Sequence, residues 1–269
     1  MVTATSNNIE NTAVAYDASA EKIVIFGKDG SSSNRGSCIV GDVSGDSVTF
    51  GTVTSVSGGD NIEYASIAYD ASAKRVVFFM DDEGNSRKPR VQIGLVNGLE
   101  ITVSNEIYLA THQVSHVSVV YDPSVGKSVF FYTNIDESND GYFISATINA
   151  QGLTADTARE FESVYAQLIQ TIYDPDQKRV VVAYKDNDSD GAAKAVRIEG
   201  TSTNLTDDNY IGIADAAYSD SATATIQVVG SVDDAQSSLT PGKKYYVQRD
   251  GSLRAVSYTH LTLPTILLV

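Results

Sequence analysis

The chain has 269 residues, of which 34 are acidic and 19 are basic, so its net charge is −15. This charge argues against nucleic-acid binding, which needs a basic surface, and against binding to or insertion into anionic membranes. The sequence contains no apolar run long enough to span a bilayer. Its N-terminal stretch, "MVTATSNNIE", lacks the basic and apolar parts of a secretory signal peptide.

The most informative feature is a phrase that recurs about every 52 residues, a period typical of repeat architectures. Each copy starts with Tyr-Asp and continues with a polar bridge, a Lys or Arg, and an apolar run such as "VVFFM" or "VVVAY". An acidic turn containing Gly follows, and then a third apolar stretch that ends at Gly45, Gly98, Gly152 or Gly200. The four copies start at Tyr16, Tyr69, Tyr121 and Tyr173.

Each unit predicts a group of short strands. The second strand is apolar at consecutive positions, as expected for burial of both faces, whereas the fourth alternates, as at Val48 and Phe50. The blades of a β-propeller have this pattern because they pack face to face around a channel. We therefore predict an all-β fold, a β-propeller-like array of four four-stranded repeats, with a solenoid or a pair of sandwiches as the alternative. The units lie around residues 11–60, 61–112, 113–166 and 167–200.

The repeated Tyr-Asp pairs have a structural interpretation. An Asp at the head of a turn accepts hydrogen bonds from backbone N–H groups two residues on, which predicts structural turns at Asp17, Asp70, Asp122 and Asp174. The four tyrosines occupy equivalent positions, so we interpret them as core or channel-side aromatics, with a ligand-binding ring as the alternative. The phrase then recurs because each unit is the packing surface for the next.

Two segments depart from the repeat. Residues 154–168, "TADTAREFESVYAQL", stand where the third unit should have its fourth strand and predict a short helix with Thr154 as its N-cap, which we interpret as an elaborated blade edge. The fourth unit lacks a fourth strand altogether, which would leave an exposed sheet edge. Residues 1–6, "MVTATS", are expected to supply that strand and to close a four-bladed ring. The competing hypothesis is that further blades precede Met1.

Beyond residue 200 the Tyr-Asp phrase is absent. Residues 201–255 predict a small, truncated β module with strands in "TATIQVVGSV" and "KKYYVQRDG". Residues 256–265, "VSYTHLTLPT", match residue for residue the translation of a transposase-based sequencing adapter. We therefore expect residues 256–269 to be a library-derived artefact without native structure, so that the natural C-terminus is absent.

Few residues suggest metal or redox chemistry. Asp186, Asp188 and Asp190 in "DNDSDG" resemble the start of a calcium loop, but Arg197 stands where the closing Glu would be. We expect a solvated turn and no cofactor, with weak Ca²⁺ binding as the alternative. The single cysteine, Cys38, is interpreted as a buried bystander.

The other candidate chemistry is equally thin. His112 and His116 share a strand face without a third ligand, and we interpret them as blade-edge residues. The acidic residues concentrate in turns, the chain has no Trp for stacking on sugars although it has 15 tyrosines, and no nucleophile elbow or phosphate loop is present. We expect no enzyme and no catalytic residue. The alternative is a secreted or virion-associated propeller hydrolase that acts on carbohydrates through paired carboxylates.

The repeats resemble the roughly 50-residue units of tail-fibre-like virion proteins from marine tailed phages. The resemblance rests on the Tyr-Asp phrases, on "GDVSGDSVTFGT" (41–52), and on "NYIGIADAAYSD" (209–220) and "LTPGKKYYVQRDGSL" (239–253), and it covers nearly all of residues 11–254. It implies a non-enzymatic structural or adhesion protein in the virion, and therefore an extracellular location. The implied partners are other virion proteins and a host-surface glycan or receptor, and such fibres are usually homotrimers.

Overall fold

A computed structural model describes residues 3–56, 60–150 and 152–199, together with short pieces of the segment 201–255. The chain divides into two compact units, Met1–Gly200 and Thr201–Val269. The described pieces of the second unit are two antiparallel pairs, β19 (Ile213–Ala214) with β20 (Ile226–Gln227) and β21 (Tyr245–Val247) with β22 (Leu253–Ala255). Residues 256–269, the predicted artefact, lie outside the described residues. Nothing helical in the described part of the chain has the length and hydropathy of a membrane span.

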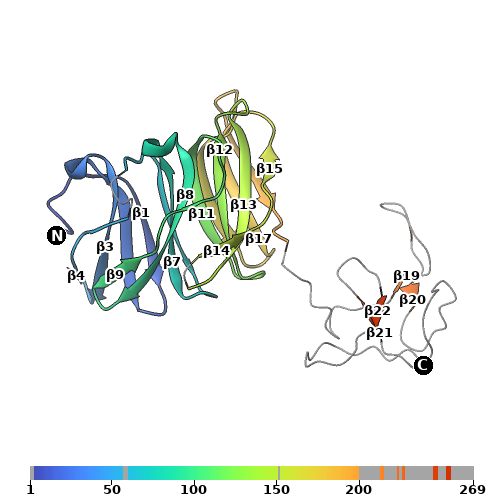
Figure 1. Cartoon of the computed structure of the whole chain (residues 1–269), viewed down its shortest axis with the longest axis horizontal. Coiled ribbons are helices and arrows are strands. Elements are labelled where there is room, and N and C mark those ends of the chain that lie inside the picture. The colour runs from blue at the N-terminus through green and yellow to red at the C-terminus, as the bar shows by residue number, and fades with distance from the viewer. Residues whose placement is uncertain are drawn as a thin grey trace. The chain divides into compact units, whose positions relative to one another are not determined.

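The first unit consists of four antiparallel sheets arranged side by side in chain order as the blades of a β-propeller (Figure 1). The predicted all-β, propeller-like array is therefore confirmed. Blade 1 contains β1 (Ile9–Asp17), β2 (Lys22–Asp29), β3 (Arg35–Ser44), β4 (Ser47–Phe50) and β5 (Thr54–Ser55). Blade 2 contains β6 (Ala65–Asp70), β7 (Arg75–Asp82), β8 (Lys88–Asn97), β9 (Glu100–Val103) and β10 (Ile107–Tyr108). Single 3-10 turns, η1 (Gly30–Ser32) and η2 (Glu83–Asn85), follow β2 and β7.

The last two blades differ in strand number. Blade 3 contains β11 (Val114–Asp122), β12 (Lys127–Asn134), β13 (Asp140–Ile148), β14 (Leu153–Ala155) and β15 (Arg159–Glu162). Blade 4 contains β16 (Gln167–Asp174), β17 (Arg179–Lys185) and β18 (Gly191–Val196). In blades 1 to 3 the fourth strand is split into two short pieces, both of which pair with the third strand. In blade 4, β18 pairs with β17 alone among the described strands.

The helix expected over residues 154–168 is wrong, because this segment forms the split outer strand of blade 3. β15 pairs with β13, and Phe161 lies over Gly141, where an added Cβ would come within 2.5 Å of the Phe161 ring. Phe161 is buried and packs edge-on against Phe131 in the core between blades 3 and 4. Burial of this ring and the sheet hydrogen bonds outweigh a local helix preference, which is only a few tenths of a kcal/mol per residue.

The N-terminal segment does not complete blade 4. Its described part, residues 3–8, is bound to blade 1 at the turn that follows β2. The Asn7 side chain donates to Asp29 Oδ2 at 2.7 Å, the Asn8 N–H donates to Ser31 Oγ at 2.8 Å, and the Gly30 N–H donates to the Asn8 carbonyl at 2.8 Å. The expected closure of the ring by this segment is therefore absent from the described residues.

The repeated aspartates form the turns between the first two strands of every blade. In blade 1, Asp17 Oδ1 accepts from the backbone N–H groups of Ser19 and Ala20, and Asp174 Oδ1 does the same in blade 4. Asp70 and Asp122 are fully buried and also accept from a serine hydroxyl within the turn. We call this end of the blades the Tyr-Asp end. The other end, which carries the turns after β2, β7, β12 and β17, is called the acidic-turn end.

The core lies between successive blades rather than inside any one of them. Alternate residues of the second strand point to opposite neighbours: Phe78 packs with Phe26 of blade 1 at a ring-centroid distance of 5.0 Å, while Phe79 packs with Phe130 of blade 3 at 5.2 Å. We call the face toward the preceding blade the leading face and the other the trailing face. Each fully buried Phe stabilises the stack by roughly 1.5–3 kcal/mol, which explains the consecutive apolar residues in these strands.

Candidate functional site

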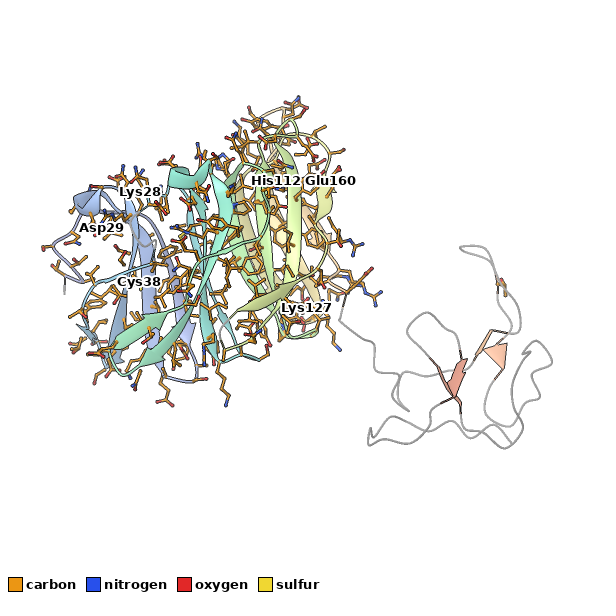
Figure 2. The ribbon with its side chains drawn as sticks, in the orientation of Figure 1. Lys28, Asp29, Cys38, His112, Lys127 and Glu160 are labelled. Atoms are coloured by element: carbon orange, nitrogen blue, oxygen red, sulfur yellow. The ribbon has the colours of Figure 1, made fainter. Side chains whose placement is uncertain are left out.

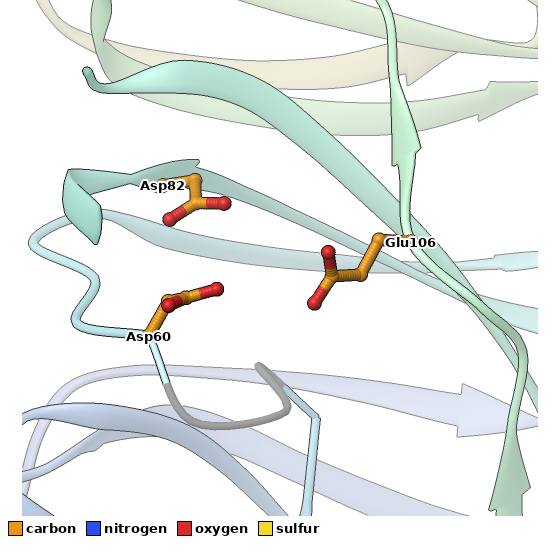
Figure 3. A group of neighbouring side chains, drawn as sticks. All are labelled: Asp60, Asp82 and Glu106. Atoms are coloured by element: carbon orange, nitrogen blue, oxygen red, sulfur yellow. The ribbon is translucent and has the colours of Figure 1, made fainter. Parts of the chain in front are cut away.

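Three carboxylates meet at the acidic-turn end of blade 2 (Figure 3). Asp82 ends β7, Asp60 belongs to the connection between blades 1 and 2, and Glu106 lies between the two pieces of the outer strand. One oxygen from each lies within 4.8 Å of the others. Sequence reasoning missed this group, because its members come from three different segments and no short motif links them.

A buried guanidinium lies among the three carboxylates. Arg90 Nη1 is 3.0 Å from Asp82 Oδ2, 3.1 Å from Asp60 Oδ2 and 3.2 Å from Glu106 Oε1. The Tyr108 hydroxyl donates to Asp82 Oδ2 at 2.6 Å and to Glu106 Oε2 at 3.2 Å. Arg90 and Asp82 are fully buried, so their charges have little access to water and depend on each other for compensation.

The arrangement fits an ion-pair network better than a metal site. Three carboxylates against one guanidinium leave a formal charge of −2. A divalent cation among these oxygens would have to displace Arg90, which already bonds one oxygen of each. The network joins the Asp60 connection and the outer strand to the middle of blade 2, and it leaves Asp60, Glu106 and Tyr108 partly exposed at the rim.

A second polar network lies beside it and reaches into both neighbouring blades. Asp81, fully buried, accepts from the N–H groups of Glu63 and Tyr64 at 2.9 and 2.8 Å and from the Arg87 guanidinium at 3.0 Å. Burial raises the pKa of Asp81, although these hydrogen bonds oppose the rise. Glu63 also forms an ion pair with Lys28 of blade 1. The connection between blades 1 and 2 is therefore bound to Asp81 of blade 2 and to Lys28 of blade 1.

The two histidines do not share a strand face, and only His116 contacts this network, whereas His112 lies beside Tyr132 of blade 3. His112 precedes β11, whereas His116 lies in β11 at a bulge, where its φ is +48°. The His116 ring lies 4.4 Å from that of Tyr64, and the Arg87 guanidinium lies over the Tyr64 ring at 5.8 Å from its centroid. Burial lowers the pKa of both histidines, and the charge of Arg87 lowers that of His116 further.

We expect these histidines to make the fold less stable in acid. A lowered folded-state pKa means that the unfolded chain takes up protons first as the pH falls below about 6.5, so stability decreases there and is fully present above it. His116→Asn should make this decrease in stability smaller, because it removes a titrating imidazole. Asn fits the left-handed backbone at this position, as Asn11 does at the equivalent bulge of blade 1. Urea unfolding at several pH values measures the free energy of unfolding of the unmodified chain, of this variant and of His112→Gln. An unchanged pH slope in both variants would contradict the expectation.

The predicted calcium residues are not gathered around a common point. Asp186 Oδ1 accepts from the N–H groups of Asp188 and Asp190 at 3.0 and 2.9 Å, which makes it the cap of the turn. Among the described residues, Asp60, Asp82 and Glu106 are the acidic group close enough to share a cation, and Asp186 is not part of it.

We therefore expect removal of calcium to have little effect. EDTA should change the melting temperature by less than about two degrees, because an open loop without a closing carboxylate binds Ca²⁺ weakly at best. Differential scanning calorimetry with added EDTA and with added Ca²⁺ measures the change. A large Ca²⁺-dependent stabilisation that Asp188→Ala removes would overturn the expectation.

The repeat tyrosines do not converge on one site. Tyr69 lies against the core between blades 1 and 2, and its hydroxyl is 2.5 Å from Ser19 Oγ of the preceding blade. Tyr173 packs in the same way between blades 3 and 4, and Tyr121 is half-buried. Tyr16, which has no described blade before it, is 56% exposed. These positions indicate packing between blades.

Cys38 lies within the sheet of blade 1, where burial raises the pKa of its thiol to about 12 (Figure 2). The thiol therefore stays protonated at neutral pH, and it is shielded from reagents. Lys127, labelled in the same figure, is buried in blade 3 and pairs with Asp156 Oδ2 at 2.6 Å. Cys38 therefore serves packing, and Lys127 links β12 to the connection between β14 and β15.

Comparison with known proteins gave structural neighbours only. No family model and no curated protein matches the chain. Solved structures that are similar include an exo-β-1,3-galactanase from Phanerochaete chrysosporium with β-1,3-galactotriose (12% identity, TM-score 0.45, covering 67% of this chain and 44% of that one). The same enzyme with galactose (10%, 0.47, 66% and 44%) and a protein of unknown function from Dyadobacter fermentans (12%, 0.49, 74% and 64%) are also similar. The chain spans less than half the length of the galactanase chains.

Proposed function

We propose that this chain is a non-enzymatic structural and adhesion protein of a tail-fibre-like phage virion, and that blade 2 contacts host-surface glycans. The observation that carries the proposal is the exposed rim at the acidic-turn end. There the side chains of Asp60 and Glu106 are 43% and 36% exposed, and the residue Tyr108 is 37% exposed, above the buried Arg90–Asp82 pair. Carboxylates accept hydrogen bonds from sugar hydroxyls, and a tyrosine ring offers an apolar face to sugar C–H groups.

The rigidity of the rim supports binding. Arg90 and the Tyr108 hydroxyl hold the carboxylates in place before any ligand arrives, so less side-chain entropy is lost on binding. The remaining repeat residues serve the fold, because the aspartates cap turns and the tyrosines pack between blades. The assignment to a virion draws on the tail-fibre resemblance of the repeats.

A glycan array with the full chain tests the proposal. We expect binding to a subset of glycans, and Glu106→Gln should weaken it about tenfold, since a lost charged hydrogen bond costs about 1.5–3 kcal/mol in a favourable case. Glu100→Gln is the matched control, because this exposed residue lies on β9 of the same blade. No binding to any glycan, or equal loss in both variants, would contradict the proposed surface.

A carbohydrate-active hydrolase is the second candidate, and the meeting of three carboxylates favours it. Glycosidases need one protonated and one ionised carboxyl group, about 5–9.5 Å apart and open to the substrate. Here Asp82 is buried, and Arg90 binds all three groups. A panel of chromogenic glycosides distinguishes the candidates: turnover that Glu106→Gln abolishes would establish the hydrolase and overturn the non-enzymatic proposal.

A further inference from the structure

Toward the Tyr-Asp end, the described residues leave the apolar leading face of blade 1 exposed, although the same face is buried in the later blades. Val14 is 64% exposed, whereas its repeat equivalents Ile67 and Val119 are 7% and 6% exposed. The three residues have the same place in the first strand, two residues before the repeat tyrosine. The difference arises because blades 2 and 3 have a sheet in front of them.

The outer part of the same face shows the same contrast. Val43 is 54% exposed, and its equivalents Val96 and Ile148 are 7% and 5% exposed. With Val14, Tyr16 and Val43, blade 1 therefore presents the apolar half of an inter-blade interface to solvent. Scattered exposed apolar residues are ordinary on a protein surface, but a set buried elsewhere in the same repeat indicates a missing partner.

The trailing face of blade 4 is the complementary unmatched half. Ile172 is 67% exposed, while its equivalent Val120 packs against the core between blades 3 and 4. Val181, on the same face, is half-buried, whereas its equivalents Val77 and Val129 are fully buried. The four described blades thus leave one leading face and one trailing face without a neighbouring blade, and these are the two kinds of face that join at the three interfaces between them.

The two ends of these faces differ from each other. At the acidic-turn end, Ala4, Thr5 and Asn7 line a pocket together with Ile25 and Ile39 of blade 1, so the leading face is partly covered there. At that end the trailing face of blade 4 is shallow, since Ala183 replaces the phenylalanine found in blades 1 to 3 (Phe26, Phe79 and Phe131). Toward the Tyr-Asp end the leading face is bare, and there the trailing face carries Ile172 and Val181.

We infer that blade 1 of one copy of this chain packs on blade 4 of a second copy, leading face to trailing face, so that the stack of blades continues from chain to chain. The interface is heterologous, and such contacts generate closed rings or open filaments. The contact of the repeat tyrosine would also continue between chains. Within the chain, the Tyr69 hydroxyl hydrogen-bonds Ser19 of the preceding blade, which is the second residue after Asp17. In blade 4 the second residue after Asp174 is Asp176. Tyr16 of one copy then donates to Asp176 of the next. The inference is independent of the glycan-binding proposal.

Sedimentation velocity of the full chain over a wide concentration range tests the inference, with two charge substitutions on opposite faces. Val14→Arg disables the leading face and Ile172→Glu the trailing face, so each variant alone should be monomeric. An equal mixture of the two should form a dimer, because one intact leading face and one intact trailing face remain. Each substitution should weaken self-association by at least about 100-fold, since it places an unpaired charge in an apolar contact.

Leu95→Arg is the control, because Leu95 is 46% exposed in blade 2 and lies away from both ends of the array. It should associate like the unmodified chain. Because the substituted positions are exposed, the variants should fold, and complementation in the mixture verifies that both did. A chain that is monomeric at every concentration, loss of association with Val14→Arg but not with Ile172→Glu, or failure of the mixture to associate would each overturn the inference.

Discussion

Replacing Arg90 by methionine should lower the free energy of unfolding by about 3–5 kcal/mol. The loss is large because the substitution removes one partner of a buried ion pair and leaves the other. Asp82 is fully buried and would keep the Tyr108 hydroxyl and the Asn85 N–H as donors, without a counter-charge beside the carboxylates of Asp60 and Glu106. Urea unfolding followed by circular dichroism measures the change, and the slope of the transition shows whether one cooperative step is retained.

The control for this substitution is Arg159→Met. Arg159 and Glu199 form an ion pair at 3.3 Å, but their side chains are 52% and 69% exposed, and such pairs contribute about 0–1 kcal/mol. If the two variants lose equal stability, the network does not hold blade 2 together.

The second large effect concerns a buried carboxylate that has a partner at one inter-blade contact and none at the next. Asp70 Oδ2 of blade 2 accepts from Ser128 Oγ of blade 3 at 2.8 Å, and both residues are fully buried. In the next pair of blades, Asp122 Oδ2 is buried without a hydrogen-bond partner, because Val180 stands where the repeat places Ser128. Ser128→Val should therefore cost about 1–3 kcal/mol, because it leaves Asp70 Oδ2 buried without a hydrogen-bond donor.

The reverse substitution should stabilise the chain. Val180→Thr keeps the shape of the side chain and brings a hydroxyl to Asp122, for a gain of about 1 kcal/mol. Val182→Thr is the matched control, since Val182 is equally buried two residues along the same strand, and its added hydroxyl should cost about 1–2 kcal/mol. Melting temperatures of the three variants measure these changes. Equal effects at positions 180 and 182 would show that the repeat does not place residue 180 beside Asp122.

Local sequence patterns predict much of the fold. The Tyr-Asp period, the consecutive apolar residues of strands such as β7 and the Asp-headed turns are short-range signals that need no long-range partner to be recognised. They predict four sheets in sequence and their turns, and the architecture follows because one such sheet cannot bury both of its apolar faces. They also predict that the fourth unit lacks a fourth strand of its own, as observed among the described strands, but they did not reveal that residues 3–8 bind to blade 1.

Long-range contacts decided the remainder. Residues 154–168 have a local preference for helix, yet burial of Phe161 over Gly141 makes them strand. Arg90, Asp60 and Glu106 lie in different segments, and only the packing of blade 2 brings their charges together. The exposure of Val14 depends on whether another sheet packs against its blade, which the identity of the residue does not determine. Turns and strand periodicity can therefore be predicted from the sequence, because the energies that determine them are local. Burial and charge pairing depend on contacts between residues that are distant in sequence, so only the folded structure reveals them.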